Sequence, residues 1–482
     1  MNDSPSGSPP LFVDTHGQMP PLWSRRCVFV ANLMALFFGN EEQTRVLGEE
    51  VGELDSYSAR LIPILNLLFE STDNVLVVER QPDPALCRYL VEDLGLSLPR
   101  ICVLPHDDYL KIARQLSSAS DVALDDLAMP QELLDSLRDK TSSGKTSSGK
   151  TSSVFLDGYV TDTVLARLAE RVGCRTVSSH AASHAGNNKL ALHQFLVADH
   201  LPTVATCLAA RPDEVADCAA RLRGEGYRSA VVRAQIGASG VGMMKLADLD
   251  DLASLPAIPA YFFHEGPCLV QGWLAPGILG IERIRSPSTQ LFLDEQHIHV
   301  FDFTEQTLSD NSIHEGNESP PPYLDELPSL RDETIRQSQR VGRWLHETGY
   351  RGTASIDWLV VERAGESVPQ VYVCEINARV TGATYPSLLA KHFHPSGAWL
   401  LRNLRLARPV TSSALLKILA ERDHLFHQGH RSGVLPLNFN FGPDGLVHKG
   451  QFICIGDDTE ECHRFLSLAE QDLPGGWSPD RD

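Results

Sequence analysis

The stretch Val371-Tyr-Val-Cys-Glu375-Ile-Asn377-Ala-Arg379 decides the fold, because it places an acid, an amide and a guanidinium on alternate positions of an apolar strand. Alternate side chains of a strand project from one face, so these three groups point the same way. Upstream, the apolar run 353–361 contains Asp357 and predicts a second strand, and 362–369 carries turn residues. A hairpin that turns near Glu366 places Asp357 opposite Glu375.

Two carboxylates directly opposite each other repel across a gap of roughly 5 Å. The pairing therefore favours a divalent cation between Asp357 and Glu375, with the amide oxygen of Asn377 as a further hard ligand, and Mg²⁺ is the expected ion. Arg379 would then offset charge that develops on a phosphoryl group. The alternative is that these side chains form only the solvated face of an antiparallel hairpin, with Arg379 as an ion-pair partner.

A glycine-rich loop lies further upstream. Residues 228–235 predict a strand that leads into Ile236-Gly237-Ala-Ser239-Gly240-Val-Gly242-Met-Met-Lys245. Such a loop lets backbone N–H groups approach phosphate oxygens. It is not a Rossmann fingerprint, because the spacing is G-x-x-G-x-G and no helix begins on it. An ordinary glycine-rich hairpin is the alternative.

With these motifs in this order, the chain resembles the ATP-grasp ligases, whose signature is an acid on one strand followed by an E-x-N-x-R strand. The resemblance implies two Mg²⁺ ions that bridge ATP phosphates to Asp357, Glu375 and Asn377. It implies that Arg379 stabilises the transferring phosphoryl group and the tetrahedral intermediate. It also implies that the glycine loop, with Gly237, Ser239 and Gly240, folds over the triphosphate.

The same resemblance assigns the remaining nucleotide contacts. Lys189 follows Asn187-Asn188, which can cap a helix, and is one expected phosphate cation. The strand before the loop usually supplies a lysine in this family, but this chain has Arg233, which is not geometrically equivalent. Adenine contacts are expected in a hinge segment from Gln271 through Trp273 to Leu274. Relatives carry a ribose-binding acid soon after the hinge, and here the first acid is Glu282.

Two segments imitate other motifs. Gly144 to Thr151 matches the P-loop pattern letter for letter, but it belongs to the tandem repeat Thr-Ser-Ser-Gly-Lys over 141–150 and follows a polar segment, so a flexible surface loop is expected. Ser24-Arg25-Arg26 before an apolar run imitates a twin-arginine signal, but no small-residue cleavage site follows. Residues 28–32 are therefore predicted to be an internal strand.

Composition excludes several classes of protein. The chain has 482 residues, a net charge of −20 and ten cysteines without zinc spacing. Strong negative charge argues against nucleic acid or an anionic membrane as a partner. No apolar run reaches transmembrane length, and unpatterned cysteines suit reduced thiols. A cytoplasmic enzyme is expected.

The predicted fold class is α/β and α+β, in three parts after a disordered tail over 1–22. A pre-grasp parallel α/β domain is expected over 23–180, with a flexible repeat loop at 141–153. An ATP-grasp domain is expected over 181–410 and a small β-rich C-terminal domain over 411–482.

This layout resembles bacterial ATP-grasp amide ligases with a dedicated C-terminal domain, the pheganomycin-type peptide ligases. The resemblance implies ATP-dependent formation of an acylphosphate on a nonproteinogenic, guanidino-bearing amino acid, followed by attack of a peptide amine, in natural-product biosynthesis. Two alternatives stay open: an ATP-binding regulatory pseudoenzyme, motivated by Arg233 and the missing ribose acid, and an ATP-grasp carboxylase or other acid ligase. A homodimer is one assembly left open.

Overall fold

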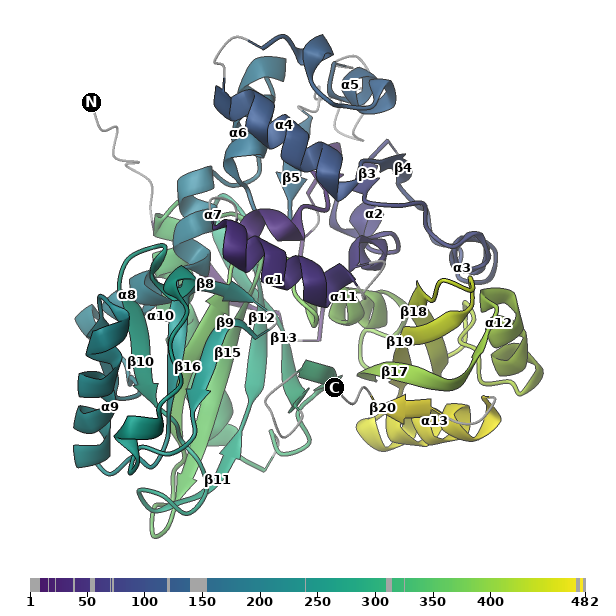
Figure 1. Cartoon of the computed structure of the whole chain (residues 1–482). Coiled ribbons are helices and arrows are strands. Elements are labelled where there is room, and N and C mark those ends of the chain that lie inside the picture. The colour runs from purple at the N-terminus through teal and green to yellow at the C-terminus, as the bar shows by residue number, and fades with distance from the viewer. Residues whose placement is uncertain are drawn as a thin grey trace.

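The computed structural model describes residues 9–479 apart from 16, 22, 38–39, 53–56, 70, 72, 119–121, 139–153, 239, 309–313, 325 and 474–476. Within these residues the strands form three sheets, whose layers are visible in Figure 1. Ser239 of the glycine loop and the repeat at 141–153 lie outside the described residues.

The first sheet is parallel, in the order β4-β3-β2-β5-β6. Its strands are β2 (Cys27–Val30), β3 (Val75–Val78), β4 (Arg100–Val103), β5 (Phe155–Gly158) and β6 (Arg175–Thr176). Successive side chains of β2 point to opposite faces of the sheet. Val28 and Val30 pack against three helices on one face, and Cys27 and Phe29 pack into a second core on the other face. Those helices are α4 (His106–Ser118), α5 (Gln131–Arg138) and α6 (Thr163–Val172). The predicted internal strand after Arg26 is therefore confirmed.

The second sheet is antiparallel, in the order β7-β10-β8-β9, and carries the glycine loop. Its strands are β7 (Thr206–Ala209), β8 (Ala230–Ala238), β9 (Val241–Leu246) and β10 (Cys268–Gly272). Helix α9 (Val215–Gly224) covers one face through Val215, Ala219 and Leu222, whose spacing is helical.

The third and largest sheet runs β11-β15-β12-β13-β14-β17-β19-β18, with β16 paired to β15, β1 to β13 and β20 to β17. Its strands are β1 (Leu11–Asp14), β11 (Ile281–Arg285), β12 (Pro287–Leu293), β13 (His297–Leu308), β14 (His314–Ser319), β15 (Gly352–Arg363), β16 (Gln370–Asn377), β17 (Ala398–Val410), β18 (Gly433–Phe441), β19 (Val447–Gly456) and β20 (Trp477–Pro479). Helices α8 (Lys189–Ala198) and α10 (Pro328–Glu347) pack on it and bury Leu192, Leu196, Val341 and Leu345.

The remaining α-helices of the described chain are α1 (Glu41–Gly52), α2 (Leu65–Leu68), α3 (Pro84–Arg88), α7 (His180–Asn187), α11 (Thr384–Phe393), α12 (Ser412–Glu421) and α13 (Thr459–Asp472). Helix α11 buries Leu388 and Leu389 in the core between the parallel sheet and the C-terminal strands. That shared core also contains a hydrogen bond of 2.7 Å from the Tyr89 hydroxyl to the carbonyl of Phe426.

One prediction for the ends of the chain was wrong in part. Residues 11–14, inside the segment predicted to be disordered, form β1, which pairs in parallel with β13. The short apolar run Leu-Phe-Val finds hydrogen-bond partners on a strand nearly 300 positions away, which composition does not reveal. At the other end, α12 and α13 flank β18 and β19 within 411–482. The sheet also crosses the expected boundary at 410, since β19 pairs with β17.

All ten cysteines lie within the described residues, and none of them forms a disulfide there. A search of the described helices finds none with the length and apolarity needed to cross a membrane.

Deleting Thr141–Lys145, one unit of the repeat, is expected to leave ATP binding and turnover within about twofold of wild type, because changing the length of a segment predicted to be a loop changes its closure entropy little. Equilibrium binding of an ATP analogue measures this directly. Loss of binding in the deletion variant would mean that Gly144 to Thr151 is a functional P-loop.

Candidate active site

The hairpin of β15 and β16 brings the predicted acids together. Asp357 lies opposite Glu375, and Ser355 lies opposite Asn377, with the chain turning between Arg363 and Gln370. A register shift follows Asp357, which is a bulge of the kind common beside functional sites. The register predicted from sequence is confirmed.

Glu375 is held by two buried cations. The Lys189 Nζ lies 3.1 Å from Glu375 Oε1, and the Arg233 guanidinium pairs with Oε2. Burial opposes ionisation of Glu375, but Lys189, Arg233 and Arg379 together hold its pKa below the usual range. Glu375 is therefore a carboxylate at neutral pH, with its charge balanced by residues from α8 and β8.

Asp357 has the opposite electrostatic character. Burial, and then the charge of Glu375, raise its pKa to about 6, although a hydrogen bond from Ser288 acts against that shift. The pKa values of the two acids thus shift in opposite directions, because the cations outweigh burial at Glu375, whereas burial outweighs the influence of Arg379 and Arg233 at Asp357. An added cation beside Asp357 would relieve this cost.

Asn377 has an oxygen with no protein partner. Its Nδ2 donates to Asp357 Oδ2 at 3.0 Å, whereas Oδ1 is buried without a hydrogen-bond partner among the described residues. A buried amide oxygen costs free energy unless something binds it. One amide oxygen and two carboxylates form a hard oxygen donor set, which fits Mg²⁺.

The glycine loop joins β8 to β9 beside this cluster. Gly240 has φ +83° with open space around it, and Gly242 has φ +80°. Residues other than glycine rarely adopt a positive φ, so glycine at both positions permits the tight turn. At the base of the loop, Lys189 Nζ donates to the carbonyl of Gly237 at 3.3 Å. Lys189 therefore links the loop to Glu375.

The predicted hinge lies at the end of β10 and just after it. Gln271 Oε1 accepts from Arg233 Nη1 at 3.3 Å, and Nε2 donates to Thr206 Oγ1 at 3.0 Å. The Lys245 ammonium lies 4.4 Å from the centroid of the Trp273 ring, and Leu274 is half-buried against the apolar cluster that contains Ile278 and Ile281. These contacts orient the segment. Glu282 is exposed on β11.

Arg379 opens onto a cavity between the parallel sheet and the β15–β16 hairpin. Its Nη1 donates to Asn187 Oδ1, and Asn187 Nδ2 donates to the carbonyl of Ala378 at 3.1 Å, so α7 fixes the backbone and side chain of this segment. The cavity is also lined by Asp157, Ser178 and Tyr350. Burial raises the pKa of Asp157 to about 7.

The sequence was compared with protein-family models and with curated proteins. No protein-family model matches the sequence. A curated relative, the [butirosin acyl-carrier protein]–L-glutamate ligase of Niallia circulans, is 30% identical over 169 residues. The match spans 34% of this chain and 36% of the relative, so the chain matches about a third of that protein's length.

Solved structures match far more of the chain. Biotin carboxylase from Campylobacter jejuni aligns with a TM-score of 0.54 over 94% of this chain and 92% of its own, at 13% identity. N5-carboxyaminoimidazole synthetase from Staphylococcus aureus, solved with ADP, aligns with a TM-score of 0.50 over 94% and 99%, at 12% identity. Both are ATP-grasp proteins. The chain has the ATP-grasp fold. The predicted family resemblance and fold class are thereby confirmed.

Within the ATP-grasp fold, five predicted site residues meet at one place: Lys189, Arg233, Asp357, Glu375 and Asn377. Gly237 joins them through Lys189, and Gln271 through Arg233. Arg379 contributes to the field on Glu375 but faces the cavity. Gly240 lies in the expected loop, and Trp273 and Leu274 lie in the expected hinge; within the described part of the chain none of the three forms a hydrogen bond or ion pair with Asp357 or Glu375.

Sequence reasoning missed three residues of this candidate site. Ser288 lies on β12 directly opposite Asp357, Asn187 accepts a hydrogen bond from Arg379, and Asp157 is the last residue but one of β5. Of these three, only Asn187 lies in a motif that the sequence analysis recognised, because it precedes the predicted helix cap Asn188. The Asn188 side chain does cap the helix, since its Oδ1 accepts a hydrogen bond of 2.9 Å from the N–H of Ala191. Ser288 comes from β12, which pairs with β15, and Asp157 comes from β5 of the parallel sheet, so both reach the site only through the tertiary fold.

Proposed function

We propose that this chain is an ATP-dependent carboxylate–amine ligase that forms a carbon–nitrogen bond and produces ADP. The observation that carries the proposal is the donor set of Asp357, Glu375 and the unpartnered Oδ1 of Asn377, set beside buried cations and a glycine loop. A structural hairpin alone gives no reason to bury an unsatisfied amide oxygen next to two carboxylates.

In this proposal Asp357, Glu375 and Asn377 hold the Mg²⁺ that accompanies ATP. The ions, when bound, neutralise charge on the phosphate oxygens. Lys189 and Arg233 keep Glu375 ionised and oriented, and Lys189 couples it to the glycine loop through Gly237. Backbone N–H groups of that loop cover the terminal phosphates and exclude water.

The reaction proceeds in two displacements. A substrate carboxylate oxygen attacks the γ-phosphorus of ATP, the bond from that phosphorus to the β-phosphate oxygen breaks, and ADP leaves. Arg379, held by Asn187 at the cavity, offsets charge on the transferring group and on the tetrahedral intermediate. The amine nitrogen then attacks the acyl carbon of the acylphosphate, and phosphate leaves with the former carboxylate oxygen.

For substrates, we propose an amino-acid-like carboxylate and a peptide or carrier-bound amine. The name of the Niallia circulans relative pairs L-glutamate with an acyl-carrier protein, which supports an amino acid as the activated acid. A guanidino-bearing acid and a peptide acceptor, in natural-product biosynthesis, form the narrower version of the proposal. The cavity beside Arg379, with Asp157 at the end of β5, is the proposed place where acid and amine meet.

The test is amine-dependent release of ADP. Purified protein with MgATP is screened against amino acids, including glutamate and guanidino acids, each with and without short peptides as amine donors. We expect ADP and phosphate to form stoichiometrically with an amide for at least one pair. Hydrolysis of ATP that no acid or amine stimulates would argue against a ligase, and ATP binding without any turnover would favour a regulatory protein.

Asp157→Asn is expected to lower kcat/KM for the amine by roughly 10²–10⁴-fold, because a carboxyl group with a pKa of about 7 can accept the proton that the amine loses. The wild-type rate should rise with pH through about 7, and the variant should lose that limb. The KM for ATP should not change. The matched control is Asp126→Asn, which replaces an exposed carboxyl group.

The pH dependence of stability distinguishes a role of Asp157 in proton transfer from a purely structural role. The folded state holds the Asp157 proton to a higher pH than the unfolded state, so wild-type stability falls as pH rises from about 4 to about 7. Asp157→Asn removes that fall and should melt no lower than wild type at pH 8. An inactive variant that also melts lower at pH 8 would assign Asp157 to structure alone.

A further inference from the structure

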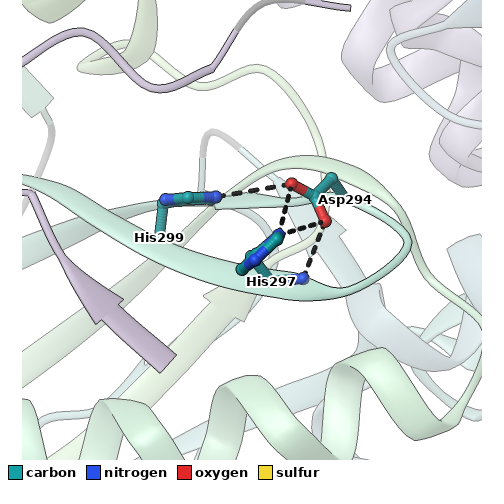
Figure 2. Close-up of side chains that lie close together, drawn as sticks. All are labelled: Asp294, His297 and His299. Carbon is teal, nitrogen blue, oxygen red and sulfur yellow. Dashed lines mark hydrogen bonds and ion pairs between the residues drawn. The ribbon is translucent and has the colours of Figure 1, made fainter. Parts of the chain in front are cut away.

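The turn between β12 and β13 gathers a second group of metal-ligating side chains, away from the acids of the hairpin. Asp294, His297 and His299 converge there, as Figure 2 shows, and one ligand atom of each lies within 4.8 Å of the others. His297 and His299 are two positions apart on β13, so their rings project from the same face of the strand.

Backbone hydrogen bonds fix the carboxylate in this turn. Asp294 Oδ1 accepts from the N–H groups of Gln296 and His297, both at 2.7 Å. Its Oδ2 faces the two imidazoles, 3.2 Å from His297 Nδ1 and 3.4 Å from His299 Nε2. The turn thus presents one oxygen and two nitrogens that are positioned by the backbone and not by a flexible loop.

These distances match a metal site better than an ion pair. A charge-assisted hydrogen bond between imidazolium and carboxylate is typically about 2.7–2.9 Å long, which is shorter than both separations. Ligands of tetrahedral Zn²⁺, with bonds of about 2.0–2.1 Å, lie about 3.3–3.4 Å from one another. The separations of Asp294 from the two histidines therefore equal the spacing between ligands of a shared ion, and the two imidazole nitrogens lie within 4.8 Å of each other.

We propose that Asp294, His297 and His299 bind a divalent transition-metal ion, with Zn²⁺ as the ion that two imidazoles and a carboxylate favour. Imidazole nitrogens disfavour Mg²⁺ and Ca²⁺. A water completes the tetrahedron from the solvent side, where the His297 side chain is 36% exposed. The site is independent of the proposed ligase reaction. It would brace the turn that lies next to Gly352 of the cavity, since Leu293 pairs with that residue.

The test is metal binding by the full chain after treatment with a chelator. Zn²⁺ is titrated against a chromophoric chelator in millimolar Mg²⁺, which occupies the acids of the proposed active site. We expect one Zn²⁺ per chain. His297→Ala and Asp294→Asn should weaken binding by at least about 100-fold, because each removes a direct ligand, and loss of an outer partner alone typically costs about 10–100-fold.

Controls make the result decisive. His448→Gln removes a histidine that also lies 3.0 Å from an acid, Asp444, but has no second imidazole, and should bind Zn²⁺ like wild type. Co²⁺ in wild type should give d–d bands without thiolate charge-transfer bands, which excludes the cysteines. Zn²⁺ should raise the melting temperature of wild type and not of His297→Ala. Equal Zn²⁺ affinity in wild type and His297→Ala, or no binding by either, would overturn the proposal.

Discussion

Glu375→Gln is expected to lower kcat/KM by at least roughly 10²–10³-fold and to destabilise the fold as well. The substitution removes the charge that balances Lys189 and Arg233, whose side chains are each 9% exposed. Leaving buried cations without a counter-charge costs up to about 3–5 kcal/mol. Loss of an electrostatic contact at the reacting phosphates accounts for the fall in rate.

Asp357→Asn is the matched comparison, because it removes the opposite acid of the same hairpin. Its rate should fall to a similar extent, but its stability should not. The raised pKa of Asp357 means that the folded state resists its ionisation, so wild-type stability declines as pH rises from about 4 to about 6. Without Mg²⁺ at pH 8, Asp357→Asn should unfold no more easily than wild type, whereas Glu375→Gln should unfold more easily. Urea denaturation in chelator measures both.

Wild-type rates in either variant at ordinary Mg²⁺ would contradict the metal assignment. Equal destabilisation by both variants would contradict the electrostatic account, in which cations outweigh the cost of burial at Glu375 but not at Asp357.

Arg379→Ala is expected to lower kcat by roughly 10³–10⁵-fold, the range found when an arginine that stabilises a transferring phosphoryl group is removed. Binding of an ATP analogue should not change, because Arg379 faces the cavity and its side chain donates a hydrogen bond to Asn187. Arg379→Lys should recover only part of the rate, since lysine lacks the planar fork of donors. Isothermal titration with the analogue and steady-state kinetics separate the two quantities.

The control is Arg336→Ala, which removes an exposed arginine that pairs within α10 with Glu333. It should leave both binding and kcat unchanged. A loss of analogue affinity in Arg379→Ala that matches its loss of rate would mean that Arg379 serves nucleotide binding and not the transfer step.

Local pattern was enough to predict the hairpin and the parallel layer. Alternation from Val371 to Arg379 determines which side chains share a face, and the turn at 364–369 determines the register, so Asp357 could be placed opposite Glu375. Four-residue apolar runs such as Cys27–Val30 similarly predict buried parallel strands.

The rest of the site depends on pairings between distant segments. Ser288 lies opposite Asp357 on β12, and Asp157 lines the cavity from β5 of the parallel sheet. The residues next to either one in the sequence therefore form no motif that predicts a functional role. The same holds for β1, whose partner is β13. The prediction that Arg233 contacts phosphate also could not include its ion pair with Glu375, because that pair joins two separate sheets.

The most direct test of the proposed chemistry follows the oxygen of the substrate carboxylate. With that carboxylate labelled with ¹⁸O, amide formation should transfer one labelled oxygen to inorganic phosphate, because the acylphosphate expels the oxygen through which it was formed. ADP should be the nucleotide product. Recovery of the label in AMP, with release of pyrophosphate, would contradict phosphoryl transfer and the role proposed for Arg379.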